Sequence, residues 1–138
     1  MALTATIGAA VNREAPAVSL DDTLRTAIRQ MTVARCSALM VKSGDEVVGV
    51  VTEMDLLEGL VRHDDLDATR VARFMTSCEL ITGRAACSPC VQLDENELVQ
   101  DALATMHKAG MHHLLVAGDG NQALGMVSVA DLLKLAIA

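Results

Sequence analysis

Apolar residues in the first half of the chain follow two alternating patterns. The segment 24–31 has apolar residues at i, i+3, i+4 and i+7, the spacing of a helix that buries one face. Short apolar runs at 37–41 and 47–51, separated by the turn-forming sequence KSGDE, predict two strands, and the run at 17–20 predicts a brief strand before the helix. Because a helical pattern follows over 53–62, the predicted order is strand, helix, strand, strand, helix.

The same order recurs in the second half of the chain. The apolar spacing predicts a helix over 99–106, which Asp94 and Glu97 would begin as a capping box, and strands at 113–116 and 123–127. A final helical pattern follows the last strand. The chain is therefore predicted to be an internal duplication.

The duplication sets the predicted domain boundaries. Residues 1–68 form the first repeat, with an N-terminal helix and a charged link at its end, and residues 69–138 form the second. Ile7 corresponds to Val71 in the matching segment that begins each repeat, and the second repeat carries an insertion at about 77–90. Since each repeat alone is too short to cover its sheet well, the two are expected to pack together as one domain.

Both repeats share a motif where the last strand meets the last helix, read as VVGVVTEMDLLEGL in one copy and ALGMVSVADLLKLAI in the other. Thr52 and Ser128 fall at the predicted N-caps, and Asp55 and Asp131 follow three positions later. Such a pair can be only a helix cap, which stabilises by about 1 kcal/mol. It also gathers a hydroxyl, a carboxylate and free backbone N–H groups where a polar ligand can bind.

These motifs, with VSLDDTLRTAIRQM, VQLDENELVQDALATM and VARFMTS, resemble a tandem pair of CBS domains, the nucleotide-sensing unit called a Bateman module. The resemblance covers nearly the whole chain except the insertion. It implies an α+β fold of two β-α-β-β-α repeats, packed through their sheets with pseudo-two-fold symmetry and leaving two clefts. It also implies a homodimer, because pairs of this family often dimerise.

The resemblance further implies an adenosine-containing ligand in the clefts: AMP, ADP, ATP or S-adenosylmethionine. Asp55 and Asp131 would accept hydrogen bonds from ribose hydroxyls, and Thr52 and Ser128 would meet a phosphate or ribose oxygen. The residues that would line the base pocket are Val18, Ala38, Val91 and His113.

The charge beside each motif Asp narrows the ligand class. The family often has an Arg immediately before this Asp, whereas this chain has Met54 and Ala130. A phosphate close to the Asp needs basic partners. The sequence therefore favours a mononucleotide or an S-adenosyl ligand over a tightly bound di- or triphosphate.

Composition excludes several other classes of protein. Eleven basic and 18 acidic residues give a net charge of −7, and one Phe is the whole aromatic content, so nucleic-acid binding is not expected. No apolar run approaches the roughly 18 residues of a membrane span, and the N-terminus lacks the pattern of a secretion signal. We therefore expect a cytoplasmic protein with no membrane partner.

The insertion contains Cys78, Cys87 and Cys90, whose chemistry the sequence leaves open. The three thiols could hold zinc with a histidine as the fourth ligand, or Cys87 and Cys90 could form a redox pair. Only one C-x2-C pair is present, so an inert loop is favoured and no metal is assigned.

No nucleophile with a placed base and no phosphate-binding glycine loop is present, so no catalysis is expected. The sequence predicts a stand-alone regulatory module that binds an adenosyl ligand and signals to an unidentified regulated protein by conformational change. The alternative is a ligand-free scaffold for dimerisation and protein interaction, with a thiol or metal switch in the insertion.

Overall fold

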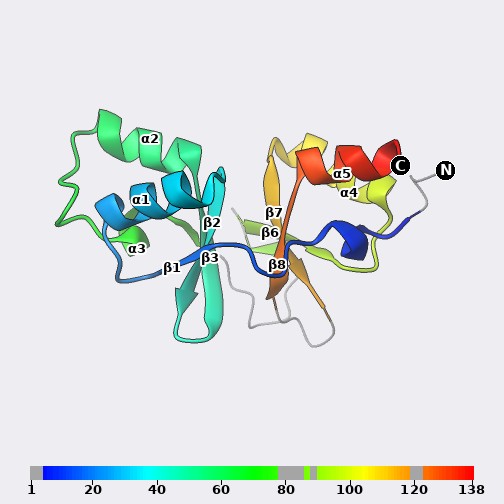
Figure 1. Ribbon diagram of the computed structural model, residues 1–138, viewed down its shortest axis with the longest axis horizontal. Coiled ribbons are helices and arrows are strands. Elements are labelled where there is room, and N and C mark those ends of the chain that lie inside the picture. The colour runs from blue at the N-terminus through cyan, green and yellow to red at the C-terminus, as the bar shows by residue number, and fades with distance from the viewer. Residues whose placement is uncertain (1–4, 78–85, 88–89, 119–122) are drawn as a thin grey trace. The chain divides into compact units, whose positions relative to one another are not determined.

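The computed structural model describes residues 5–77, 86–87, 90–118 and 123–138 of the chain (Figure 1), with the side chains of residues 77, 86–87, 90–92 and 123 left out. The chain divides into two compact units. The first-repeat unit is Ala15–Cys90. The second-repeat unit is Val91–Ala138 together with the N-terminal segment up to Glu14.

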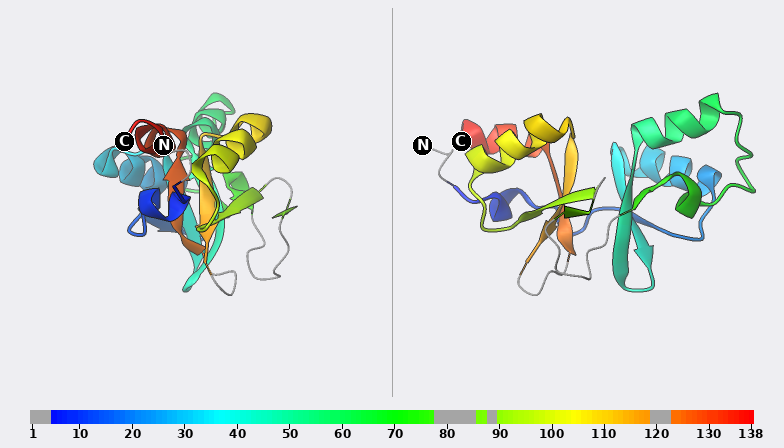
Figure 2. Two further views of the ribbon diagram at one scale, coloured as in Figure 1. Left: turned by 90° about the vertical axis from the view of Figure 1, so that its right-hand side faces the viewer. Right: turned by 180° about the vertical axis from the view of Figure 1, so that it is seen from behind.

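The first repeat forms a four-stranded sheet in the order β1-β2-β3-β4, with β1 parallel to β2 and the other neighbours antiparallel. Helices α1 and α2 lie against one face of this sheet (Figure 2). The strands are β1 (Ala17–Ser19), β2 (Ala38–Ser43), β3 (Glu46–Thr52) and β4 (Thr76–Ser77). The helices are α1 (Leu24–Ala34), α2 (Glu53–Val61) and α3 (Val71–Phe74).

The second repeat has the same order of elements and a second sheet ordered β5-β6-β7-β8, with β6 parallel to β7 and β7 antiparallel to β8. The strands are β5 (Ala86–Cys87), β6 (Cys90–Asp94), β7 (His113–Ala117) and β8 (Ala123–Ser128). The helices of the second-repeat unit are α4 (Val99–Ala109), α5 (Val129–Ala136) and, from the N-terminal segment, η2 (Ile7–Ala10). The predicted α+β fold of two β-α-β-β-α repeats is confirmed. The way the repeats pack through their sheets stays a prediction.

The capping box predicted for α4 is wrong. The helix begins after Leu98, which makes no side-chain cap. Asp94 and Glu97 instead close a turn before the helix, in which the Glu97 N–H donates to the Asp94 carbonyl oxygen at 3.0 Å and the Glu97 carboxylate accepts the Asp94 N–H at 3.4 Å. The contacts between Asp94 and Glu97 therefore lie in the turn before the helix, too early in the sequence to cap it.

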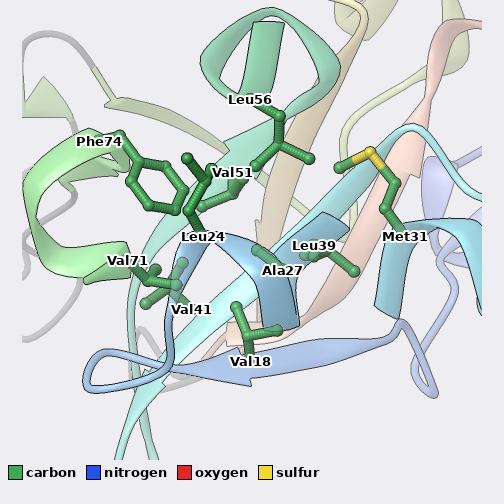
Figure 3. Packing of buried hydrophobic residues seen from close by; sticks show 10 residues of the cluster. All are labelled: Val18, Leu24, Ala27, Met31, Leu39, Val41, Val51, Leu56, Val71 and Phe74. Atoms are coloured by element: carbon green, nitrogen blue, oxygen red, sulfur yellow. The ribbon is translucent and has the colours of Figure 1, made fainter. Parts of the chain in front are cut away.

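The core of the first-repeat unit lies between the sheet and its helices (Figure 3). Its buried members are Val18, Leu24, Ala27, Met31, Leu39, Val41, Val51, Leu56, Val71 and Phe74. Each fully buried large apolar side chain stabilises the fold by about 1.5–3 kcal/mol relative to exposure. Phe74 and Val71 come from α3, which begins the second repeat in the sequence but packs into the core of the first-repeat unit.

The N-terminal segment makes the reciprocal exchange. Ile7 is fully buried in the core of the second-repeat unit, beside residues such as Val99 and Leu132. The Ile7 N–H donates to the Glu97 carbonyl oxygen at 2.9 Å, and the Val99 N–H donates to the Ala5 carbonyl oxygen at 2.9 Å. The predicted boundary after residue 68 follows the sequence repeat, whereas the compact units exchange these leading segments.

Within the described residues, none of the helices has the length and apolar content needed to cross a membrane.

Candidate functional site

The first candidate site is the junction of β3 and α2, where the predicted cap is confirmed. Thr52 is the N-cap, and its hydroxyl oxygen accepts the Asp55 N–H at 3.3 Å. Asp55 returns the contact, since its Oδ2 accepts the Thr52 N–H at 2.9 Å and the Thr52 hydroxyl at 3.2 Å. We call this reciprocal capping box the first motif.

Burial of the half-buried Asp55 side chain raises the pKa of its carboxyl above the usual range. The two hydrogen bonds from Thr52 oppose this shift, and the nearby charge of Glu58 adds to it. Among the hydrogen bonds of the described residues, Oδ2 is the acceptor and Oδ1 takes none. One carboxylate oxygen thus orients the side chain while the other can accept a further hydrogen bond.

The second candidate site, which we call the second motif, is the junction of β8 and α5. The Ser128 hydroxyl oxygen accepts the Asp131 N–H at 3.1 Å, and the Ser128 hydroxyl donates to Asp131 Oδ2 at 2.8 Å. In this part of the described chain the Ser128 N–H does not donate to the Asp131 carboxylate, so the box is half formed. Asp131 therefore carries fewer internal hydrogen bonds than Asp55.

The strand register brings one predicted base-pocket residue to each motif. Ala38 lies opposite Thr52 in the β2–β3 pair, and His113 lies opposite Ser128 in the β7–β8 pair. The neighbouring backbone matches as well, because the first helical N–H donates to the Ser37 carbonyl oxygen at 3.1 Å in one motif and to that of His112 at 2.9 Å in the other.

The other two predicted base-pocket residues lie elsewhere. Val18 pairs with Val41 and is buried in the core beneath α1, with 4% of its surface exposed. Val91 lies in β6, and its side chain is outside the described part of the structure. The pocket-lining role of all four residues stays a prediction.

A glycine in each motif has a structural role that the sequence reasoning missed. β4 pairs with β3 as its antiparallel neighbour and lies so close that a Cβ on Gly49 would lie against the Thr76 carbonyl oxygen. At Gly125 an added Cβ would lie against the Asn12 carbonyl oxygen, and Asn12 pairs with Met126 through two backbone hydrogen bonds of 2.8 and 3.2 Å. The signal was the shared glycine of the two motifs, which marks a close backbone approach.

The two motifs differ in the charge around them. The first helical residue is Glu53 in the first motif, where the second motif has Val129, and Glu58 stands where the second has Lys134. His112 is exposed directly before β7. The first motif is therefore surrounded by acidic groups, whereas the second has a lysine and a histidine near its single carboxylate.

The three cysteines of the insertion lie mostly outside the described structure. Cys78 is among the residues not described, and Cys87 and Cys90 are described only as backbone of β5 and β6. Within the described chain, no group of three His, Cys, Asp or Glu side chains could hold a metal ion. The zinc and redox alternatives stay predictions.

Comparison with known proteins places these motifs in a family. The sequence model of the CBS domain matches residues 7–62 and 83–138. Arabinose 5-phosphate isomerase KpsF of Escherichia coli is 27% identical over 122 residues, which are 88% of this chain. This chain spans 34% of that relative's length, so the likeness concerns only part of the enzyme.

Solved structures match nearly the whole chain. A CBS-domain protein from Burkholderia ambifaria MC40-6 is 27% identical, with a TM-score of 0.77 over 99% of this chain and 90% of the other. The CBS domain pair of MJ0100, in complex with 5′-methylthioadenosine and S-adenosylmethionine, is 16% identical, with a TM-score of 0.75 over 96% of this chain and 95% of the other.

The CBS domain of a bacterial CNNM/CorC-family Mg²⁺ transporter, in complex with ATP, is 21% identical, with a TM-score of 0.78 over 99% of this chain and 89% of the other. At these identities, this structure and that of MJ0100 establish the shared fold alone.

Proposed function

The chain belongs to the CBS domain family as a tandem pair of repeats, and we propose that it is a regulatory module, without catalysis of its own, that binds an adenosine-containing ligand. The observation that carries this proposal is the duplicated hydroxyl–carboxylate pair at the start of α2 and α5. In each pair a hydrogen bond fixes the carboxylate through Oδ2. Oδ1 can then accept a hydrogen bond from a ribose hydroxyl.

The ligands of related structures support the chemical class. One relative is solved with 5′-methylthioadenosine and S-adenosylmethionine, and another with ATP. All three ligands contain adenosine and differ in what is attached at its 5′ position. A fixed carboxylate that recognises the ribose is compatible with each of them, so the 5′ group must be distinguished by other residues.

We assign the phosphate-bearing ligand to the second motif. Glu53, Asp55 and Glu58 would repel a phosphate near the first motif. At the second motif Lys134 follows Asp131 by three positions on the same helix, and His112 lies beside the cap. Met54 and Ala130 leave both motifs without an arginine, which favours AMP over ATP as the tighter ligand.

Regulation follows from the energetics of binding. A ligand shifts a conformational equilibrium only by the difference between its affinities for the two states. In the proposed mechanism the adenosyl ligand favours one arrangement of the repeats, and a partner protein binds that arrangement. The homodimer and the regulated partner remain predictions of this account.

A thermal-shift panel tests the proposal with AMP, ADP, ATP, S-adenosylmethionine and 5′-methylthioadenosine. A ligand present at a hundred times its Kd stabilises the folded state by about 2.7 kcal/mol, which raises the Tm by several degrees. The stabilisation should disappear in the double variant Asp55→Ala/Asp131→Ala. If no ligand raises the Tm near millimolar concentration, the proposed sensing function is excluded.

A ligand-free scaffold is the second candidate, and the exposed apolar face of α2 favours it. This candidate predicts that the panel leaves the Tm unchanged while the protein still self-associates. The two functions are therefore separated by one pair of measurements.

A further inference from the structure

The N-terminal segment 5–14, which we call the strap, lies in the second-repeat unit, whereas the chain continues from Ala15 into the first-repeat unit. Its helix η2 lies next to α5 (Figure 1). The contacts between the strap and the second-repeat unit are main-chain hydrogen bonds, the burial of Ile7 and an exposed ion pair of 3.4 Å between Arg13 and Glu95. A segment of this kind can open locally while the rest of its unit stays folded.

The strap contacts the strand on one side of the second motif. The Asn12 N–H donates to the Met126 carbonyl oxygen at 2.8 Å, and the Met126 N–H donates to the Asn12 carbonyl oxygen at 3.2 Å. Gly125 lies so close to this bridge that an added Cβ would meet the Asn12 backbone. Met126 precedes the cap residue Ser128 by two positions, so the bridge holds the end of β8 at which the cap begins.

The strap also contributes to the core on both sides of the second motif. Ile7 is fully buried in the same cluster as Val127 and Leu132. These two residues stand immediately before Ser128 and immediately after Asp131 in the sequence. Because a closely packed cluster loses stability when a large member leaves it, release of Ile7 weakens the packing of both residues that flank the motif.

The first motif has an equivalent support from α3 and β4. Val71 is fully buried in the core of the first-repeat unit, and Thr76 pairs with Val50 of β3. The Val71 N–H also donates to the Asp22 carbonyl oxygen at 2.7 Å. The chain on both sides of this support belongs to the same unit, which keeps it near its docking site. Release is therefore easier for the strap.

We propose that the strap is a conformational switch for the second motif. When the strap is docked, it holds Ser128 and Asp131 in the arrangement that binds a ligand. When the strap is released, the second motif loses this arrangement and its ligand, while the first motif is unaffected. The ligand part of this proposal rests on the proposed function. By linkage, a ligand at the second motif favours the docked strap by the same free energy as the strap favours the ligand.

Backbone hydrogen exchange of the full chain, followed by NMR, tests the structural part. Asn12→Pro removes the N–H that donates to Met126 without emptying the core, and Asn12→Ala keeps this N–H and is the matched control. Asn12→Pro should speed exchange of the Asp131 N–H about threefold to tenfold, the effect of losing one hydrogen bond, and Asn12→Ala should leave it within about twofold. Exchange of the Asp55 N–H should not change in either variant.

The Met106 N–H inside α4 distinguishes release of the strap from a general loss of stability. Asn12→Pro should speed exchange of the Ile7 and Asp131 N–H groups and leave that of Met106 unchanged. Equal acceleration at Asp131 and Met106, or no acceleration at Asp131, would show that the strap does not hold the motif and would overturn the proposal.

AMP at a hundred times its Kd tests the linkage in the natural protein. Exchange of the Ile7 and Asn12 N–H groups should slow about a hundredfold, because the ligand stabilises only the docked state. Exchange of the Val71 N–H should not change. If AMP slows exchange at Asp131 and not at Ile7, the strap is not coupled to the ligand and the proposal is overturned. If AMP does not bind, the proposed function fails, and the two Asn12 variants still decide whether the strap holds the motif.

Discussion

The two motifs share a backbone but differ in how they are closed and charged. In both, a glycine in close contact with the backbone of a paired segment precedes a hydroxyl residue that caps a helix, and an Asp follows the hydroxyl residue three positions later. The first motif closes as a full capping box in an acidic setting. The second is half formed, with Lys134 nearby. The two copies thus share their backbone geometry and differ in the completeness of the capping box and in the charge of the residues around it.

Substitution of the glycines shared by the two motifs should cause the largest loss of stability. Gly49→Ala and Gly125→Ala each place a Cβ against a backbone carbonyl oxygen, which cannot move without displacing the paired segment. We expect each substitution to lower the free energy of unfolding by about 1–3 kcal/mol, measured by urea denaturation.

Gly59→Ala is the matched control for these glycines. A Cβ there would make only ordinary contact with Leu24, at 3.4 Å, and alanine favours the helix by about 1 kcal/mol. Its stability should therefore stay equal or rise. If Gly49→Ala and Gly125→Ala are as stable as Gly59→Ala, the close approach of the paired backbone is not what requires glycine.

Removing the helix caps should lower the free energy of unfolding by a smaller amount, and the loss should differ between the two motifs. Thr52→Ala removes the acceptor of the Asp55 N–H from a full box, and we expect a loss of about 1–2 kcal/mol. Ser128→Ala removes the equivalent contact from a half-formed box, with an expected loss of about 0.5–1 kcal/mol. Urea denaturation of both variants measures the difference, and a larger loss at Ser128 would contradict it.

Lys134 tests the difference in charge. Lys134→Gln should weaken AMP binding about twofold to fivefold, the range of an exposed ion pair, and leave uncharged 5′-methylthioadenosine unaffected. Glu58→Gln, at the equivalent position of the first repeat, should leave AMP affinity unchanged. Isothermal titration calorimetry gives both values. Equal weakening of both ligands by Lys134→Gln would show that the lysine acts through structure and not through its charge.

The smallest effect concerns pH. Because burial raises the pKa of Asp55 in the folded state, its carboxyl binds a proton at higher pH than in the unfolded chain, where the pKa is about 3.9. The stability from this group is therefore full below that value and is lost as pH rises through the folded pKa. The stability of the natural protein relative to Asp55→Asn should fall across this window.

Glu58→Gln is the control for the pH effect. Removing the Glu58 charge removes one cause of the raised pKa, so the same window should move to lower pH. Chemical denaturation at a series of pH values measures both. A relative stability that rises with pH would contradict the direction of the Asp55 shift.

The sequence predicted the regular elements and caps because these depend on local patterns. Apolar spacing located α1, and the repeated motif located Thr52 and Ser128. The reciprocal exchange of Ile7 and Val71 was visible only as a matching pair, because apolar spacing does not say which core a segment enters.

The details of the candidate sites depended on contacts that a sequence does not contain. The close approach of β4 to Gly49 and the incomplete box at Ser128 both depend on backbone positions fixed by tertiary packing. The α4 cap failed for a related reason, since Asp94 and Glu97 have the spacing of a box but are held in a turn. The residue types and their spacing predicted which groups could interact, and the position of the backbone in the folded protein determined which of these interactions form.

Isothermal titration calorimetry with AMP tests most directly whether the second motif is the nucleotide site. Removing a charged hydrogen-bond acceptor costs about 1.5–3 kcal/mol, so Asp131→Ala should weaken AMP binding tenfold or more. Asp55→Ala should change the affinity by less than about threefold. A loss confined to Asp55→Ala, equal losses in the two variants, or no binding of AMP by the natural protein would contradict the account.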